Sequence, residues 1–235
     1  MGYSSIPVIK KLKVAIISTG DELKQPGTDL ERGEIYESNS FGISGLVKWL
    51  GHEPIRLHSI GDTIDDLREI LNSASTEADL IITSGGVSMG DWDLVRKIME
   101  EEGDVHFWRV KLRPGSPPLF GLWNSTPIFG LPGNPVSSHV VFRMLVAPWI
   151  RNTTRATGPV ENRALAKLAT NLKSTKDCIT LRRVSIKYES EGLTAYQEIH
   201  QGSGNLASMA LSEGMAILQP GQQYSAGDMV EVMFI

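Results

Sequence analysis

Glycine followed by an acidic residue recurs at the ends of three strand-like segments of this 235-residue sequence. The three segments end in "STGDEL", "SIGDT" and "TSGGVSMGDWD". Ligands of open α/β sheets bind beyond the carboxyl ends of the strands, so carboxylates from all three loops can meet at one edge. One such loop alone is equally typical of a capped helix or a plain turn. The three together predict a shared acidic site, formed by Asp21, Glu22, Asp62, Asp91 and Asp93.

Groups suited to binding an anion accompany these carboxylates. Backbone amides in the glycine-rich loop from Ser84 to Gly90 can cradle an anion. The segment "GLPGNPVSS" places the turn Pro132–Pro135 ahead of a helix, with Ser137 and Ser138 near the helix N-terminus. This arrangement predicts a second anion site. The alternative for the same segment is an ordinary turn.

Basic residues alternate in the segment "FWRVKLRPGSP". Arg109, Lys111 and Arg113 are two residues apart, so a strand would place them on one face. A solvated face is the alternative interpretation of such a pattern. Because the cations lead directly into a Pro-Gly turn, we expect them to face the predicted anion site.

Carboxylates beside an anion cradle repel the anion unless a divalent cation lies between them. The combination therefore predicts Mg²⁺ and metal-assisted chemistry at a phosphoanhydride or another oxyanion. The Gly-Lys-Ser/Thr end of a Walker A loop is missing, and no G-x-G-x-x-G follows the first strand. The G-x-S-x-G elbow of serine hydrolases is also missing, and the five histidines show no metal-ligand spacing.

The elements that must position these residues alternate between strand and helix. Continuous apolar runs predict strands at 12–19, 53–60 and 78–84, with further strands at 104–112, 117–123 and 126–132. Helical patterns lie at 39–50, 64–74, 91–102 and 135–150. This alternation predicts a parallel-rich three-layer α/β/α domain over residues 1–155. Short alternating segments between glycine-rich turns predict a small all-β barrel or sandwich over residues 156–235.

Composition excludes several classes of protein. An apolar content of 41% with 21% charged residues is typical of a soluble globular protein, and a net charge of −4 argues against a general nucleic-acid binder. Cys178 is the single cysteine, so an internal disulfide is impossible. The apolar run "HVVFRMLVAPWI" is broken by Arg143 and Pro148 and cannot span a bilayer. We therefore expect a cytoplasmic protein that binds neither nucleic acid nor membrane.

The motifs in their order along the chain resemble those of the molybdopterin molybdenumtransferases, the MoeA and gephyrin-type proteins. The resemblance rests on "STGDEL", "GEIYESNS", "TSGGVSMGDWD", "FWRVKLRPGSPPLFG" and "GLPGNPVSS", and "GSGNLASMALSEGMAIL" is similar to the family's C-terminal β domain. It implies a transferase of molybdenum cofactor biosynthesis. In the implied reaction, adenylylated molybdopterin and molybdate are the substrates, Mg²⁺ is the cofactor, and AMP is released.

The resemblance also implies roles for individual residues. Glu22, Asp62 and Asp93 match the acidic catalytic positions, and Asp62 and Asp93 match metal ligands. The loop from Ser84 to Gly90 matches a pterin-phosphate cradle. The full set of implied substrate-binding residues is Thr19, Gly20, Asp21, Ser84, Gly85, Gly86, Val87, Ser88, Gly90, Arg109, Arg113, Pro132, Gly133, Asn134, Pro135 and Ser137.

Two departures from the family pattern affect these expectations. Ser116 stands where members usually carry a second basic residue, which predicts one weaker anion contact. The family also has two domains before the first strand that complete the active site across a dimer, whereas here only "MGYSSIPVIKK" precedes it. The chain is then a fragment, a short homologue that needs a partner, or a form without catalysis. We expect a homo-oligomer and a partner that supplies the missing domains. The alternatives to an enzyme are a carrier of molybdopterin or its adenylate, and an interaction scaffold.

Overall fold

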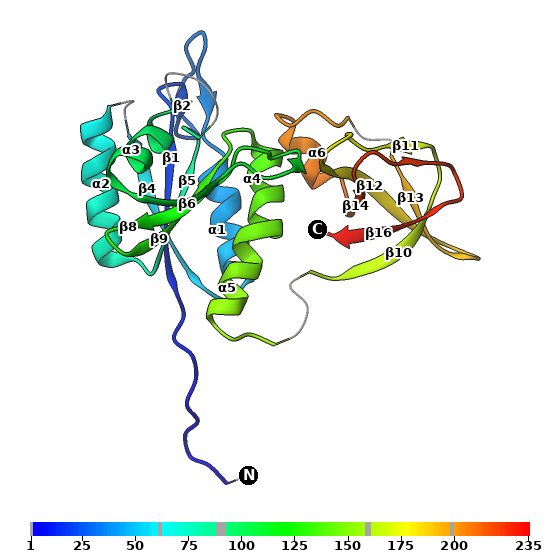
Figure 1. The fold of residues 1–235 in the computed structure, drawn as a ribbon, viewed down its shortest axis with the longest axis horizontal. Coiled ribbons are helices and arrows are strands. Elements are labelled where there is room, and N and C mark those ends of the chain that lie inside the picture. Colours follow the sequence, from blue (N-terminus) through cyan, green and yellow to red (C-terminus); the bar gives the residue numbers. More distant parts are fainter. Residues whose placement is uncertain (1, 61–62, 88–92, 158–160, 198–199) are drawn as a thin grey trace.

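The computed structural model describes residues 2–60, 63–87, 93–157, 161–197 and 200–235. A parallel-rich sheet covered by helices on both faces is followed by a barrel-like β domain (Figure 1). The predicted three-layer α/β/α domain and small β domain are therefore confirmed. The end of the last helix at Thr153 and the next strand at Arg163 flank the division that we place after residue 155, which stays a prediction. None of the described helices is long and apolar enough to cross a membrane.

The central sheet has the strand order β4-β1-β5-β9-β8-β6. Strands β4, β1, β5 and β9 run parallel, and β8 and β6 join through antiparallel pairing. Parallel central strands are covered on both faces, and accordingly every residue of β5 is buried. The strands are β1 (Lys13–Thr19), β4 (Glu53–Ile60), β5 (Leu80–Ser84), β6 (Asp104–Trp108), β8 (Leu119–Trp123) and β9 (Thr126–Leu131).

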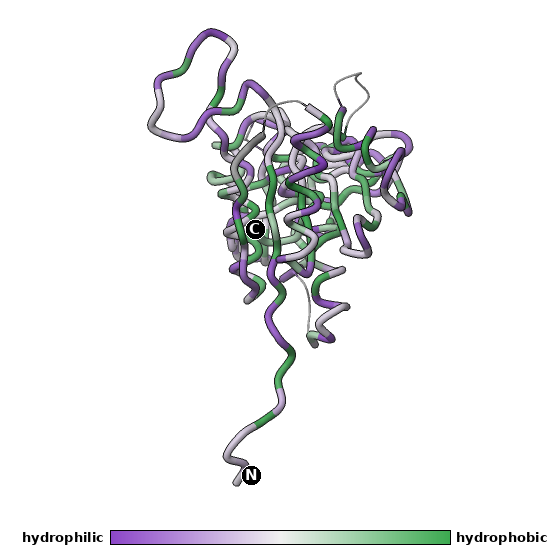
Figure 2. The backbone as a smooth tube through the Cα atoms, turned by 90° about the vertical axis from the view of Figure 1, so that its left-hand side faces the viewer, coloured by the Kyte–Doolittle hydropathy of each residue, from purple (hydrophilic) through white to green (hydrophobic). Residues whose placement is uncertain are grey.

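An arm of the chain projects beyond the carboxyl ends of these strands, between β1 and the first helix. Two short parallel strands, β2 (Leu23–Lys24) and β3 (Ile35–Tyr36), form its base. Figure 2 shows that the arm is mostly hydrophilic, whereas hydrophobic segments concentrate in the body of the molecule. The arm therefore adds little to the core and borders the edge of the sheet where we expect the site.

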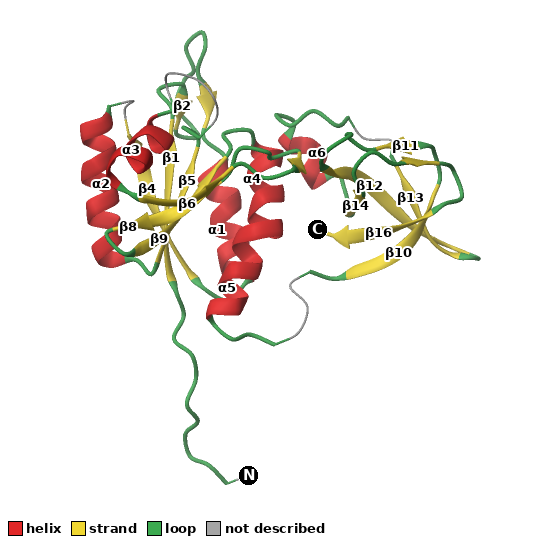
Figure 3. Ribbon diagram, in the orientation of Figure 1, coloured by secondary structure: helices red, strands yellow, loops and turns green. Residues whose placement is uncertain are grey.

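Helices cover the two faces of the sheet (Figure 3). Strand residues alternate between them: Val14 and Ile16 of β1 pack toward one face, and Ala15 and Ile17 toward the other. Helices α2 (Ile64–Glu77) and α3 (Leu94–Glu102) cover the second face. The first face is covered by α1 (Asn39–Trp49) and by the continuous helical segment of α4 (Pro135–Val141), the π-helix η1 (Phe142–Val146) and α5 (Ala147–Thr153).

Local sequence signals account for several element boundaries. Thr63 caps α2, since its Oγ1 accepts a hydrogen bond of 3.2 Å from the Asp66 backbone N–H. Pro135 stands in the first turn of α4, where a missing N–H costs nothing. Asn124 and Ser125 join β8 to β9 with φ angles of 47° and 67°, the conformation of a tight hairpin turn.

The C-terminal domain is a mostly antiparallel sheet of order β13-β10-β16-β14-β12, in which β10 and β13 pair in parallel. Strand β13 also pairs with β12 and closes the ring. Its short helix α6 (Leu206–Ala210) lies beside α4. The strands are β10 (Arg163–Leu168), β11 (Leu172–Lys173), β12 (Ile179–Glu189), β13 (Gly192–Tyr196), β14 (Gly214–Leu218), β15 (Gln223–Tyr224) and β16 (Met229–Phe234).

A strand from the first part of the chain joins this second sheet. Strand β7 (Leu112–Arg113) pairs in parallel with Ile179 and Thr180 of β12. The expected strand over residues 104–112 is therefore confirmed for 104–108 and wrong beyond it: β6 ends at Trp108, and Arg109 adopts a φ of 72°. Arg109, Lys111 and Arg113 do not share one strand face, because the chain turns at Arg109 to pass from one sheet to the other.

The two domains share a hydrophobic core and a buried ion pair. The cluster under α1 and α4 continues into the outer face of the β domain through Leu181, Met215, Ile217 and Met233. Arg143 of η1 binds both carboxylate oxygens of Glu161 at 2.9 Å, with the two side chains 11% and 3% exposed. Burial raises the pKa of Glu161, and the adjacent Arg143 opposes this shift. Continuous apolar packing holds the β domain against α4 and fixes the cleft between them.

His139 of α4 gives a test of this packing. Burial, and then the positive charge of Arg143, lower the pKa of His139 to about 4. In the unfolded chain the His139 imidazole binds a proton more tightly than in the folded protein. The contribution of neutral His139 to the free energy of unfolding is therefore present above pH 6.5 and is lost as the pH falls toward 4. We expect wild type to lose about 3 kcal/mol more unfolding free energy than His139→Gln over that window. Urea titrations at each pH measure the free energy of unfolding. His106→Gln, at an exposed position, is the matched control. Parallel curves for wild type and His139→Gln would contradict the prediction.

Candidate functional site

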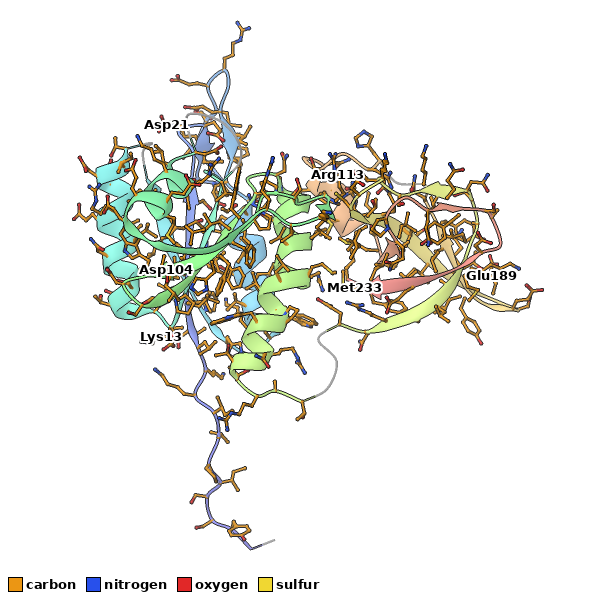
Figure 4. The ribbon with its side chains drawn as sticks, viewed as in Figure 1. Lys13, Asp21, Asp104, Arg113, Glu189 and Met233 are labelled. Carbon is orange, nitrogen blue, oxygen red and sulfur yellow. The ribbon has the colours of Figure 1, made fainter. Side chains whose placement is uncertain are left out.

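A cleft of 1140 Å³ lies at the carboxyl ends of β1, β5 and β9, and its lining comes from both domains. Figure 4 shows Asp21 and Arg113 at this end of the molecule, opposite Lys13, which begins β1. The location is the one expected for ligand sites in open α/β sheets. Fourteen of the predicted residues line it: Thr19, Gly20, Glu22, Ser84, Gly85, Gly86, Val87, Arg109, Arg113, Pro132, Gly133, Asn134, Pro135 and Ser137.

The loop after β5 forms the floor of the cleft. Gly85 has a φ of 102°, and a Cβ at this position would lie 2.7 Å from the Thr19 carbonyl oxygen. Only glycine permits this approach of two strand ends. The Gly85 N–H donates to Leu131 O at 3.0 Å, so the loop is also fixed to the end of β9. Three neighbouring strand ends are thereby held together around one space.

Glu22 is the predicted catalytic carboxylate that faces this space. It lies within the turn closed by the hydrogen bond from Leu23 N to Gly20 O, 3.1 Å. Its carboxylate folds back over Gly20, where a Cβ would lie 2.6 Å from Glu22 Oε2. Beside it, the buried Thr19 Oγ1 has no hydrogen-bond partner among the described residues. The wall near β1 therefore offers an acidic group and a polar hydroxyl to a ligand.

Sequence reasoning missed two polar site residues, Asn39 at the start of α1 and Glu37 just before it. Asn39 Nδ2 donates to Ser84 Oγ and to Gly133 O, both at 2.7 Å, and so bridges two loops of the cleft. Glu37 is 3% exposed and accepts from Ser18 Oγ at 3.0 Å and from Ser40 N at 2.7 Å. The polar run "YESNS" at the start of a predicted helix is the signal in the sequence that could have indicated these two residues.

The turn before α4 forms another wall. Ser137 lines the cleft, whereas the buried Ser138 turns inward and donates its hydroxyl to Pro132 O. The Val136 N–H, in the first turn of the same helix, donates to Ser203 O of the β domain at 3.1 Å. This hydrogen bond joins the start of α4 to the opposite wall, so part of the predicted second anion site serves domain contact.

The cationic wall consists of Arg109 and Arg113, which both line the cleft. The exposed Lys111 between them is not part of the lining. Ser116 lines the cleft at the position where the resemblance led us to expect a second basic residue. Two guanidinium groups therefore line the same cleft as Glu22 and the glycine loop.

The β domain supplies a wall that sequence reasoning missed. Thr175, Thr180, Arg182, Gln201, Ser203 and Gly204 all line the cleft. The loop that carries the last three is held by the buried Arg183, whose Nη2 donates to His200 O at 2.9 Å and Gly202 O at 3.1 Å. Burial, and secondarily the charge of Arg182, lower the pKa of Arg183. Local sequence carried no signal for this wall, because its place depends on how the barrel docks.

The remaining predicted residues fall into two groups. Asp62, Ser88, Gly90 and Asp91 lie outside the described residues. The exposed Asp21 and the α3 N-cap residue Asp93 are described but are not part of the lining. Within the described ranges, no group of three His, Cys, Asp or Glu side chains is arranged to hold a metal ion.

Comparison with known proteins places this geometry in a family. Residues 15–152 match the family model described as "Probable molybdopterin binding domain", and residues 165–235 match "MoeA C-terminal region (domain IV)". The chain is 33% identical over 237 residues to the molybdopterin molybdenumtransferase of Haemophilus influenzae, covering 99% of this chain and 58% of that protein. A relative of the same name from Bacillus subtilis is 33% identical over 240 residues, covering 100% and 55%.

The solved structures agree with the family models. The molybdopterin biosynthesis MoeA protein of Pyrococcus horikoshii superposes with a TM-score of 0.81 at 30% identity, over 95% of this chain and 54% of that one. The chain thus spans about half the length of the relatives that it matches. Because one family model covers more than half of the chain and the second covers its β domain, the protein belongs to the molybdopterin-binding domain family, in the MoeA branch.

Proposed function

We propose that this chain carries the centre for Mg²⁺-dependent insertion of molybdate into adenylylated molybdopterin, with release of AMP. The observation that carries the proposal is the cleft itself, where a glycine loop, two arginines and Glu22 line one 1140 Å³ space. Curated relatives named molybdopterin molybdenumtransferase support the reaction class. Hydrolysis of the phosphoanhydride consumes one water and breaks one P–O bond, which frees AMP.

The lining residues suggest a division of roles. Arg109 and Arg113 are suited to binding the phosphoryl and molybdate oxyanions, since guanidinium groups form charge-assisted hydrogen bonds to such groups. The loop from Ser84 to Val87 cradles a phosphate through its backbone. Glu22 orients the attacking water and accepts its proton. The docked β domain shields the phosphoanhydride from bulk water.

The residues present fit a magnesium ion in one respect. Mg²⁺ keeps several waters and is usually bound through one or two carboxylates together with substrate phosphates, so a cage of three protein ligands is not required. Glu22, lying over Gly20, faces the space where such phosphates would bind. We propose Asp62 and Asp93 as the metal ligands. When bound, the ion supplies charge neutralisation at the phosphoanhydride.

The proposal extends to the assembly of the protein. The chain spans about half the length of its relatives, and both described domains contribute to the cleft lining. We propose that a homo-oligomer, or a partner protein, completes the rim of the cleft. We further propose that the protein acts in the cytoplasm.

A carrier of molybdopterin or its adenylate is the second candidate function. One observation favours it: of the described carboxylates that we predicted for the site, Glu22 alone lines the cleft. The groups that bind oxyanions would suffice for a carrier, and hydrolysis would then require residues from elsewhere. The two functions differ in whether bound adenylate is released as AMP.

The test is AMP release from adenylylated molybdopterin by the purified chain, followed by chromatography. We expect release to depend on both molybdate and Mg²⁺, and EDTA to lower the rate by about 100-fold or more, because the divalent charge is lost. Restoring Mg²⁺ after EDTA is the control for irreversible damage. Tight binding of the adenylate without AMP release would reject the enzyme and support the carrier.

A further inference from the structure

Trp108, the last residue of β6, contacts two parts of the cleft lining, the glycine loop and Arg109. Its indole Nε1–H donates to Val87 O at 3.1 Å. Val87 is 1% exposed and belongs to the glycine loop on the floor of the cleft. The indole therefore fixes the backbone of the loop that we propose as the phosphate cradle.

Two guanidinium groups also lie over the Trp108 ring. The Cζ atom of Arg109 is 4.8 Å from the ring centroid, and that of Arg96 is 3.7 Å away. Both distances are within the range of cation–π attraction, for which tryptophan is the strongest ring. Arg96 is itself fixed, because its backbone N–H donates to Gly86 O at 3.0 Å and its Nε donates to Glu100 Oε1 at 2.8 Å. One ring thus connects α3, the glycine loop and a cation of the cleft.

The backbone at Arg109 requires such support. Its φ of 72° is in the left-handed region that residues other than glycine rarely adopt, and strain of this kind is concentrated at functional sites. Hydrogen bonds from Arg109 N to Pro118 O and from Val110 N to Ser116 O, both 2.9 Å, hold the turn. The exposed Arg109 side chain faces the cleft, and the Trp108 ring limits the positions that its guanidinium group reaches.

We propose that Trp108 is a positioning residue that holds the Arg109 guanidinium in register with the glycine loop, so that cation and backbone amides bind the same oxyanion. The bound group is either the phosphoryl group of a nucleotide or molybdate, which share oxyanion chemistry. The reaction served rests on the proposed function, whereas the binding effect does not. An arginine that is stacked before binding loses less side-chain freedom when it binds an anion.

The test measures binding of two probes, AMP and sodium molybdate, by calorimetry on the intact chain. We expect Trp108→Leu to lower the affinity for the probe that Arg109 contacts by about 3- to 30-fold. The reason is that the stacking on Arg109 and the hydrogen bond to Val87 are both lost. Trp108→Phe keeps a ring, and we expect a smaller loss. Trp123→Phe is the matched control, because the Trp123 Nε1 also donates a hydrogen bond, at 3.0 Å to Asn72 Oδ1 of α2, outside the cleft lining. Its affinity should equal that of wild type.

A double-mutant cycle with Arg109→Gln separates positioning from a general structural role. If Trp108 acts through Arg109, Trp108→Leu has little further effect on affinity once Arg109 is Gln. A full effect of Trp108→Leu in the Arg109→Gln background would overturn the proposal, as would unchanged affinity of Trp108→Phe and Trp108→Leu for both probes. If Trp108→Leu does not fold, the Trp108→Phe cycle decides. If wild type releases no AMP but the double-mutant cycle still shows the expected coupling, the proposed reaction is rejected and this inference stands.

Discussion

Replacing Glu22 by Gln is expected to lower the rate of AMP release by about 100- to 10,000-fold, the range typical for loss of a positioned acid–base group. The amide has nearly the same shape as the carboxylate that folds over Gly20, so the cleft keeps its form. It can neither accept a proton from water nor offer a negative charge to Mg²⁺. Binding of the adenylate, measured by calorimetry, should stay within about threefold of wild type, because the phosphate cradle is untouched. A lowered rate together with an unchanged affinity would identify Glu22 as a group that acts in the reaction and not in binding.

The matched control is Glu34→Gln on the same arm. Glu34 pairs with Lys24 at 3.1 Å and is absent from the lining of the cleft. Its hydrogen bonds, first to the Glu31 backbone, lower the pKa of Glu34, so its role is local. We expect wild-type turnover for this variant. Equal losses of binding and turnover in Glu22→Gln would instead assign Glu22 to the structure of the arm.

Replacing Arg113 by Gln is expected to weaken oxyanion binding by about 10- to 100-fold, the range for losing a hydrogen bond to a charged group. The strand pairing of β7 with Thr180 uses backbone atoms, so glutamine preserves the position of the residue. Affinity for molybdate and for AMP, measured separately, shows which oxyanion Arg113 contacts. The contribution should decrease with added salt, because exposed charges are screened over about 10 Å at 0.1 M ionic strength.

Lys111→Gln removes the same charge two residues away and serves as the control. Lys111 is exposed and does not line the cleft. If direct contact matters, only the Arg113 variant loses affinity. If both variants lose it equally and the loss disappears at high salt, the cations act through the general field of the protein and not as ligands.

Part of this architecture followed from the sequence because it depends on local periodicity. The runs "VAIIS" and "LIITS" are too apolar to have a solvated face, so they had to be central strands covered by helices on both sides. Parallel neighbouring strands bring their carboxyl ends to one edge. That geometry alone predicted that residues near Thr19, Ser84 and Pro132 would line one cleft, which is their arrangement in the structure.

What local patterns could not decide is how the two domains meet. The alternation of Arg109, Lys111 and Arg113 indicated one strand, yet the chain turns at Arg109 and gives β7 to the barrel. Nothing in the spacing of Arg182 and Gln201 indicated that they line the same cleft as Glu22. The buried Arg183, which supports their wall, likewise gave no signal in the sequence.

The sequence by itself determined the sheet, the covering helices and the edge where the cleft lies, since hydrophobic periodicity and strand direction are local properties. Only the tertiary structure decided the opposite wall, the turn at Arg109 and the link from Val136 to Ser203. These depend on contacts between residues far apart in the chain, whose partners are selected by packing of the shared core through Leu181, Met215 and Met233 against the α4 face.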